Sequence, residues 1–308
     1  MTTAFAARMA ERLDETLGGL LEPGRAVALI NFANHSNPGD SAIWLGTLAV
    51  LERLRVPVGY ASDPSSFSET ALREAIGDGP LLLNGGGSFG DLYGGQQGLR
   101  EYVLEHCTDR RIIQLPQSIW FEHREKRDRM RRLCAAHPAF TLLVRERQSF
   151  EIAQRWFDVP ALLCPDMAFG LGPLHEAARA ERPLLWIGRR DGEAVDRGPP
   201  PAELPVLDWL DAPLDDEISV APPFRPRAEA WLRRGTRLVL SAEVVVTDRL
   251  HAHILAIALG VPHVVLDNSY GKISSTFETW THESGLAHWA ETTAQALSIA
   301  AELIRARR

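Results

Sequence analysis

The stretch VVVTDRLHAHILAIALG places cationic and imidazole side chains where an apolar strand gives way to a helix. Thr247 or Asp248 can cap that helix, so Arg249 and His251 fall in its first turn. A cation is unfavourable there unless an anion lies beside it, because the helix dipole is positive at this end. The spacing therefore indicates an anion site at a strand end.

The helical pattern alone does not decide which histidine faces a ligand. At 100° per residue, Arg249 and His253 share the less apolar strip, whereas His251 points toward Leu255 and Ala258. A helical wheel therefore predicts a core position for His251 and an exposed one for His253. Because first-turn residues can lean into a crevice, a structural and a catalytic role for His251 carry equal weight at this point.

Arginines end two other apolar strands. FTLLVRERQSF places Arg145 at one strand end, and WIGRRDGE places Arg189 and Arg190 at another. Such a guanidinium needs an anionic partner, which for Arg145 could be Asp166 or a ligand. Arginine binds carboxylate and phosphate bidentately, so two such strand ends facing one crevice would suit a ligand with two anionic groups.

The loop NFANHSNPGDSAIWLG holds more polar groups than a strand-to-helix connection needs. Asp40 can cap the helix from Ser41, and Pro38-Gly39 can form the turn before it. This leaves no structural role for four polar residues, Asn34, His35, Ser36 and Asn37. They favour a site for an anion or a sugar hydroxyl beside the helix N-terminus, with a self-satisfied polar turn as the alternative.

The segment LLLNGGGSFGDLYGG matches G-x-G-x-x-G literally, but its context does not fit a dinucleotide site. Glycines such as Gly86 and Gly87 would instead let the backbone approach a ligand or another lobe, with Ser88 and Asp91 projecting. A glycine-rich turn without a ligand is the alternative.

Two further strand ends add hydrogen-bonding groups. LPQSIWF ends in Gln117 and Ser118, which suit sugar hydroxyls, and LDNSYGKISS offers Lys272 and Ser274 as a second grip on an anion. A capped, solvent-facing loop is the alternative for the latter.

Apolar runs alternate with helical patterns along the whole chain. Continuous runs predict strands at 27–32, 56–61, 80–84, 111–116 and 140–145, and again at 183–189, 243–248 and 262–268. Helical patterns lie at 41–54, 96–106, 124–137 and 147–157, and then at 225–234, 249–259 and 290–305. This order predicts an α/β fold with doubly wound, mostly parallel sheets.

The two sets of elements predict two Rossmann-like lobes, residues 1–172 and 173–308, joined near 170–182. The proline run at 199–201 makes the following loop stiff and extended. The C-terminal helix could pack back on the first lobe. Ligands bind beyond the carboxyl ends of such strands, so we expect the active site in the crevice between the lobes.

Composition narrows the class of protein. The 308 residues, 45% hydrophobic and 24% charged, suffice for a full core and two domains. The net charge of -7 excludes a general nucleic-acid binder, so an anionic substrate would need local cations. Three scattered cysteines without a CxxC motif favour reduced thiols in the cytoplasm and argue against structural zinc.

No segment reads as a membrane anchor. The first 21 residues predict an amphipathic helix and not a signal peptide, and the longest uncharged run, 250–266, contains three His, a Gly and a Pro. We expect a cytoplasmic protein without stable membrane insertion, which would meet a lipid-linked substrate only at the inner face of the membrane.

Six segments together resemble the polysaccharide pyruvyl transferase family, over about residues 26–280. In chain order they are NHSNPGDSAIWLG, NGGGSFGDLY, IIQLPQSIWF, GRRDGE, TDRLHAHIL and LDNSYGKISS. The resemblance implies a two-lobed fold like that of GT-B glycosyltransferases. It also implies transfer of a pyruvate ketal from phosphoenolpyruvate to two sugar hydroxyls in exopolysaccharide or cell-surface glycan biosynthesis, with release of phosphate, no metal and no cofactor.

The resemblance assigns roles residue by residue. The R-x-H of the family's DRLHGH motif falls on Arg249 and His251, with Ala252 where Gly is common. The family's strand-end arginine falls on Arg145, and the lysine of its Y-G-K segment falls on Lys272.

The R-T-D segment of the family corresponds to Arg189, Arg190 and Asp191. Because Arg190 replaces the usual threonine, either arginine could hold the donor.

These matches imply a division of labour. His251 would protonate the enol methylene carbon, because an acid with a pKa near neutrality suits that step. The residues expected to hold phosphoenolpyruvate are Arg145, Arg189, Arg249, Lys272 and Ser274. Asp40 or Asp91 would be the base on the sugar hydroxyl. The residues expected to line the sugar side, mainly in the first lobe, are Asn34, His35, Asn37, Gly39, Gly86, Gly87, Gln117 and Ser118.

Three rival functions differ in what they bind. A glycosyltransferase of the same fold would bind a nucleotide sugar, a non-catalytic subunit would hold a sugar without turnover, and a dehydrogenase rests only on the weak glycine match. The sequence leaves open the acceptor sugar, the ketal linkage, any lipid link and the oligomeric state.

Overall fold

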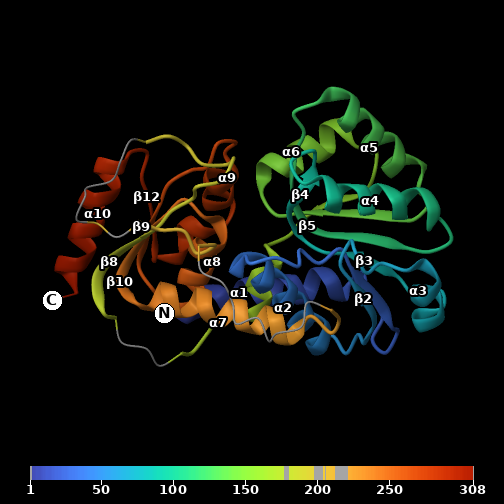
Figure 1. Cartoon of the computed structure of the whole chain (residues 1–308), viewed down its shortest axis with the longest axis horizontal. Coiled ribbons are helices and arrows are strands. Elements are labelled where there is room, and N and C mark those ends of the chain that lie inside the picture. The colour runs from blue at the N-terminus through green and yellow to red at the C-terminus, as the bar shows by residue number, and fades with distance from the viewer. Residues whose placement is uncertain (1, 177–179, 198–203, 205, 212–220, 308) are drawn as a thin grey trace.

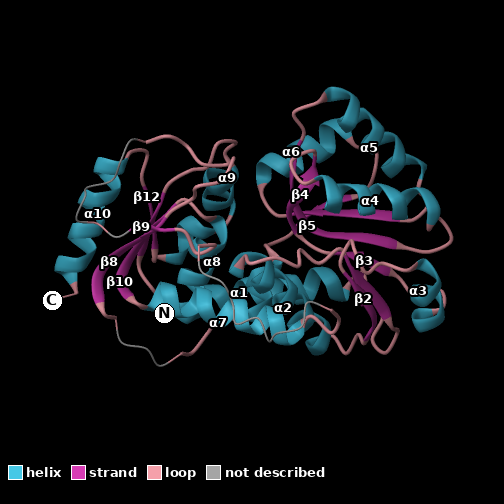
Figure 2. Ribbon diagram, in the orientation of Figure 1, coloured by secondary structure: helices cyan, strands magenta, loops and turns pink. Residues whose placement is uncertain are grey.

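Two parallel β-sheets with helices packed against them make up the protein (Figures 1 and 2). The computed structural model describes residues 2–176, 180–197, 204, 206–211 and 221–307. The elements of the first part are α1 (Thr2–Gly18), β1 (Val27–Ile30), α2 (Pro38–Arg53), β2 (Val58–Ser62), α3 (Glu69–Ile76), β3 (Leu81–Leu83), β4 (Gly86–Gly90), α4 (Gly94–His106), β5 (Ile112–Trp120), α5 (Arg124–Ala136), β6 (Phe140–Val144), α6 (Arg147–Trp156), β7 (Ala161–Leu163) and the 3-10 helix η1 (Met167–Leu171). Those of the second part are β8 (Arg182–Ile187), β9 (Val206–Leu207), α7 (Arg225–Leu240), β10 (Ala242–Thr247), α8 (Leu250–Leu259), β11 (His263–Val265), α9 (Lys272–Thr279), η2 (Thr281–Ser284), β12 (Ala287–Trp289) and α10 (Thr293–Ala306).

The strand order of both sheets confirms the predicted doubly wound α/β fold. The first sheet runs β2-β1-β3-β5-β6-β7 with β4 also paired to β5, and the second runs β12-β11-β10-β8-β9; every described pair is parallel. The order reverses between β1 and β3 and between β8 and β10. Such switch points are where open α/β sheets bind ligands.

The glycine-rich segment forms a strand, and not the turn that was the alternative to a ligand-binding backbone. Gly86 to Gly90 make β4, which pairs with β5 at the Gln117 to Trp120 end. Gly90 has φ 152°, and a Cβ there would overlap the backbone carbonyl of Trp120. Glycine is therefore needed for β4 to lie this close to β5. Like β9 and β12, this strand lacks the continuous apolar run that predicts most of the others.

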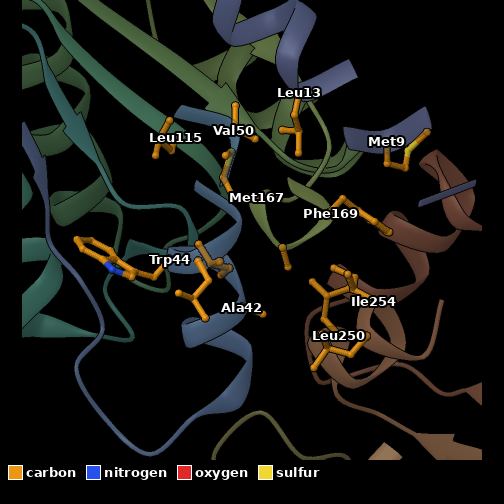
Figure 3. Close-up of a cluster of buried hydrophobic side chains, with 14 of the residues drawn as sticks. Met9, Leu13, Ala42, Trp44, Val50, Leu115, Met167, Phe169, Leu250 and Ile254 are labelled. Atoms are coloured by element: carbon orange, nitrogen blue, oxygen red, sulfur yellow. The ribbon is translucent and has the colours of Figure 1, made fainter. Parts of the chain in front are cut away.

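One hydrophobic core joins helices of both parts. Figure 3 shows members of this core from both parts, among them Met9 and Leu13 of α1, Trp44 of α2, Phe169 of η1 and Ile254 of α8, and all five are buried. Helix α7 packs against α2, and α1 packs against α8 (Figure 1). These contacts hold the carboxyl ends of β1 and β10 in a fixed relation.

The division at residue 172 stays a prediction. Residues 177–179 of the predicted join and the proline run at 199–201 lie outside the described residues. Helix α10 contacts β10 and β11, so it covers the second sheet and not the first lobe.

Both helices that start at the predicted site begin differently from expectation. The side chain of Asn37, and not Asp40, caps α2 by accepting a hydrogen bond from the Gly39 N–H, so Pro38-Gly39 is its first turn. Helix α8 begins at Leu250 with Arg249 in the cap position.

Candidate active site

A cavity of about 280 Å³ lies among residues from the carboxyl ends of both sheets. The predicted site residues that line it are His35, Asn37, Asp40, Gly87, Arg145, Arg189, Arg249, His251 and Lys272. The first four follow β1 and β3, Arg145 follows β6, and the last four come from the second part of the chain. The structure therefore brings the four predicted Arg and Lys side chains to one cavity.

Arg145 is buried in a network of acids. Its Nη1 lies 2.6 Å from Asp166 Oδ2, its Nε donates to Ser118 Oγ at 2.9 Å, and Glu146 lies 3.6 Å away. Burial raises the pKa of Asp166, but the charges of His251 and Arg145 outweigh it and hold that pKa well below its usual range. The partner that the sequence suggested for Arg145 is thus the one it has.

Glu193 ties two more cations together. Its carboxylate lies 3.1 Å from Arg189 Nη1, forms an ion pair with Lys272 Nζ and accepts a hydrogen bond of 2.8 Å from Tyr93. Burial lowers the pKa of Lys272 to about 8, because it and the nearby guanidinium groups outweigh the attraction of Glu193. Burial opposes ionisation of Glu193, yet Lys272 and Arg189 lower its pKa to about 2.

The two arginines that end β8 diverge. Arg189 lines the cavity and binds Asp191 through Nε and Nη2 at 2.9 Å. Arg190 is exposed, and its guanidinium bonds to Asp211 at 2.8 Å. The geometry therefore favours Arg189 for a ligand in the cavity.

Arg249 also has an acidic partner. Its Nη2 lies 2.5 Å from Asp208 Oδ2, and the carboxylate accepts further hydrogen bonds from the backbone N–H groups of Arg190 and Leu210. Each of the four cations is therefore paired with an acid, and they face one cavity.

His251 lies at the centre of this arrangement. Its Nε2 is 3.5 Å from Asp166 Oδ2 and 3.4 Å from Arg145 Nη1, and its side chain is 12% exposed. A Cβ on Gly39 would overlap the imidazole, so the first turn of α2 supports one side of the ring. The imidazole Nε2 thus lies beside both a carboxylate and a guanidinium at the edge of the cavity.

The wheel prediction for the two histidines is wrong. His253 is fully buried, because α8 is covered on nearly all sides and offers no exposed face. His263 Nδ1 donates to the Val261 carbonyl at 2.9 Å, His263 Nε2 accepts from His253 Nδ1 at 2.6 Å, and His253 Nε2 accepts from Thr281 at 2.8 Å. This chain of bonds needs both rings neutral.

The buried pair predicts loss of stability in mild acid. Burial lowers the pKa of His263 to about 4 and that of His253 well below 6.5. As the pH falls from the ordinary histidine pKa of 6.5 towards the lowered pKa values of the folded protein, the two histidines take up protons in the unfolded chain but not in the folded one. Each histidine should then reduce the free energy of unfolding by about 1.4 kcal/mol per pH unit. Urea unfolding at pH 7.5 and 5.0 measures this, with exposed His282→Gln as control; a His263→Gln variant as acid-sensitive as the wild type would contradict it.

Several predicted site residues serve the fold and do not line the cavity. Asp91 accepts hydrogen bonds from the backbone N–H groups of Glu122 and His123, so its geometry does not support a base in the cavity. Ser274 Oγ donates to the Gly271 carbonyl. Three other polar residues also lie outside the cavity lining: Asn34 bonds to Asp63, Gln117 bonds to Ser88 and Asn84, and Ser118 bonds to Glu146. The glycines Gly39 and Gly86 do not line the cavity either.

Four polar or aromatic residues of the cavity escaped prediction, namely Glu193, Tyr93, Gln96 and Trp209. Glu193 follows the strand-end arginines by three residues, which is the one local signal for it. Asp208, the partner of Arg249, follows the two-residue strand β9, which is too short to show an apolar run.

Among the described residues, no cluster of three or more His, Cys, Asp or Glu side chains is arranged to hold a metal ion. In the same part of the chain, every helix is too short or too polar to cross a bilayer.

Comparison with known proteins gives consistent matches. The sequence pattern of the family described as "Polysaccharide pyruvyl transferase" matches residues 37–270. "Pyruvyl transferase 1" of Schizosaccharomyces pombe is 36% identical over 283 residues, which cover 84% of this chain and 70% of the relative. "Putative pyruvyl transferase EpsO" of Bacillus subtilis is 29% identical over 292 residues, or 87% and 90% of the two chains. A crystal structure of a functionally uncharacterized protein of Klebsiella pneumoniae has the same fold, with a TM-score of 0.65, 19% identity and coverage of 92% and 99%.

Proposed function

Because the chain belongs to the polysaccharide pyruvyl transferase family, we propose that phosphoenolpyruvate is its donor. The transferase would move the enolpyruvyl group onto two hydroxyls of a sugar as a ketal and release phosphate. We place this reaction in the synthesis of an exopolysaccharide or another cell-surface glycan.

The observation that carries the proposal is the meeting of four cationic side chains at one small cavity. Arg145, Arg189, Arg249 and Lys272 come from four different strand ends and line a space of about 280 Å³. Phosphoenolpyruvate carries a carboxylate and a phosphate on a three-carbon frame, so both anionic groups can reach such a cluster at once.

His251 is the proposed proton donor. It lies beside Arg145, which would hold the donor, and its Nε2 is 3.5 Å from the carboxylate of Asp166. Protonation of the methylene carbon makes C2 electrophilic, and a sugar hydroxyl attacks there. A second hydroxyl then replaces phosphate and closes the ring.

A glycosyltransferase with a nucleotide sugar is the second candidate, because the two-sheet fold also suits that chemistry. It is distinguished by its ligand: it would bind a uridine or guanosine diphosphate and ignore phosphoenolpyruvate.

Calorimetric titration separates the two candidates. We expect phosphoenolpyruvate to bind in the micromolar to millimolar range that is usual for enzyme substrates, and UDP or GDP to give no heat of binding. Because Lys272 has a pKa of about 8, affinity should weaken as the pH rises through 8 and this cation loses its proton. Binding of a nucleoside diphosphate in place of phosphoenolpyruvate would refute the proposal.

A further inference from the structure

A histidine and an aspartate form a pair at the rim of the cavity, next to the turn that supports His251. His35 Nε2 lies 3.2 Å from Asp40 Oδ2, and both residues line the cavity. The side chain of His35 is 54% exposed, whereas that of Asp40 is 18% exposed. Building on the proposed function, we infer that His35 is the base that takes the proton of the acceptor hydroxyl and that Asp40 positions it.

The charge pattern of the cavity singles out this pair. Three acids line the cavity, and two of them, Asp191 and Glu193, are bound to Arg or Lys side chains. Asp40 contacts no Lys or Arg within 4.0 Å in the described part of the chain; its Oδ2 instead accepts from Asn37 Nδ2 at 2.8 Å and faces His35. The pair is thus free to accept a proton without breaking an ion pair.

The exposed member of the pair is the better base. A carboxylate that holds an imidazole nitrogen orients the ring and stabilises the imidazolium that forms on proton transfer. Near neutral pH an imidazole is a more effective proton acceptor than a carboxylate. His35 also lies on the side that a large sugar chain can reach from solvent.

The two histidines close a balanced proton cycle. In the first step the hydroxyl oxygen bonds to C2, its proton passes to His35, and the C=C electron pair takes a proton from His251 at C3. In the second step the C2–O bond to phosphate breaks, the second hydroxyl bonds to C2, and its proton restores His251. The proton on His35 passes through solvent to the released phosphate.

The test compares His35→Gly with His123→Gly. His123 is a matched control, because it is half exposed and lies 3.0 Å from Asp91, but outside the cavity lining. Phosphate release is measured with phosphoenolpyruvate and methyl glycosides of galactose, glucose, mannose and their N-acetylated forms. We expect His35→Gly to slow release by about 10²–10⁴-fold with an unchanged donor Kd, and added imidazole to restore part of the rate. His123→Gly should behave as the wild type.

Other outcomes would overturn the inference. A structural role predicts that His35→Gln restores activity and that imidazole does not. If His35→Gly releases phosphate at the wild-type rate, His35 is not the base. The proposed function would stand in that case, because the wild-type protein still turns over phosphoenolpyruvate. A wild-type protein that neither binds phosphoenolpyruvate nor releases phosphate with any of these sugars would refute the proposed function and this inference with it.

Discussion

His251→Gln is expected to bind phosphoenolpyruvate with nearly wild-type affinity and to release phosphate about 10²–10⁴-fold more slowly. Glutamine can keep a hydrogen bond to Asp166 or Arg145, which lie 3.5 and 3.4 Å from the imidazole Nε2. It cannot deliver a proton to carbon. The loss should therefore fall on kcat and leave the donor Kd, measured by calorimetry, close to its original value.

Two further variants separate the chemistry of His251 from its packing. Gly39→Ala keeps the imidazole but places a methyl group in the space of the ring, so the ring must move and turnover should fall as well. His282→Gln alters an exposed histidine of η2 and should leave both kcat and Kd unchanged. Wild-type phosphate release by a folded His251→Gln protein would remove His251 from the mechanism.

The positions of the four cations were predictable, and so was Asp166 as a partner of Arg145, but Asp208 as the partner of Arg249 was not. Arg145 and Arg249 can be recognised in the sequence because a guanidinium at the end of an apolar run is unusual. Their acids come from other elements: Asp166 caps η1 and Asp208 follows β9. No local spacing links such pairs, so only the fold reveals that each cation is already compensated.

The two histidines of α8 show why periodicity failed within a correctly predicted helix. A helical wheel needs an exposed face for contrast, and α8 has almost none, because β10, β11, η1 and the helices α1, α2 and α7 pack against it. His253 meets His263 and Thr281, which are distant in sequence. His251 was identified by its resemblance to a family motif, and its place in the cavity agrees with that prediction.

Asp91 illustrates the opposite error. It follows a strand end and was a reasonable candidate for a base. The pairing of β4 with β5 brings the backbone N–H groups of Glu122 and His123 to its carboxylate, so it organises the chain entering α5. A free strand-end acid and a structural one look alike in sequence, because the difference lies in a strand that the glycine-rich segment did not predict.

Glu193→Gln is expected to tighten phosphoenolpyruvate binding by about tenfold at pH 6.5. The four cations of the cavity face four acidic partners, Asp166, Asp191, Glu193 and Asp208, so an incoming donor with at least two negative charges meets a compensated cluster. For the donor to bind these cations, at least one of the four acids must give up its ion pairs with them. Removing a like charge within a few ångströms is worth on the order of 1 kcal/mol or more in a partly buried site.

Glu193 is the acid whose bonds are easiest to exchange. The carboxylates of Asp166, Asp191 and Asp208 each accept hydrogen bonds from backbone N–H groups, those of Ala168, Glu193 and Leu210 respectively. In the described part of the chain, the Glu193 carboxylate has only side-chain partners: Lys272, Arg189, Tyr93 and Asn268. Two of these, Lys272 and Arg189, are cations proposed to hold the donor, so the Glu193 carboxylate would compete with the donor for them.

Both pH and a matched variant sharpen this test. The Glu193 charge raises the pKa of Lys272, so its removal lowers that pKa further from about 8, and the gain in affinity should shrink at alkaline pH. Tyr93→Phe removes the hydroxyl that donates to Glu193 without changing the charge, and it should leave the Kd within about twofold. A higher Kd in Glu193→Gln would show instead that Glu193 holds Lys272 and Arg189 in place for the donor.

The Glu193→Gln substitution removes one partner of a buried ion pair, so it should also lower the Tm of the free protein. Saturating phosphoenolpyruvate should restore that Tm.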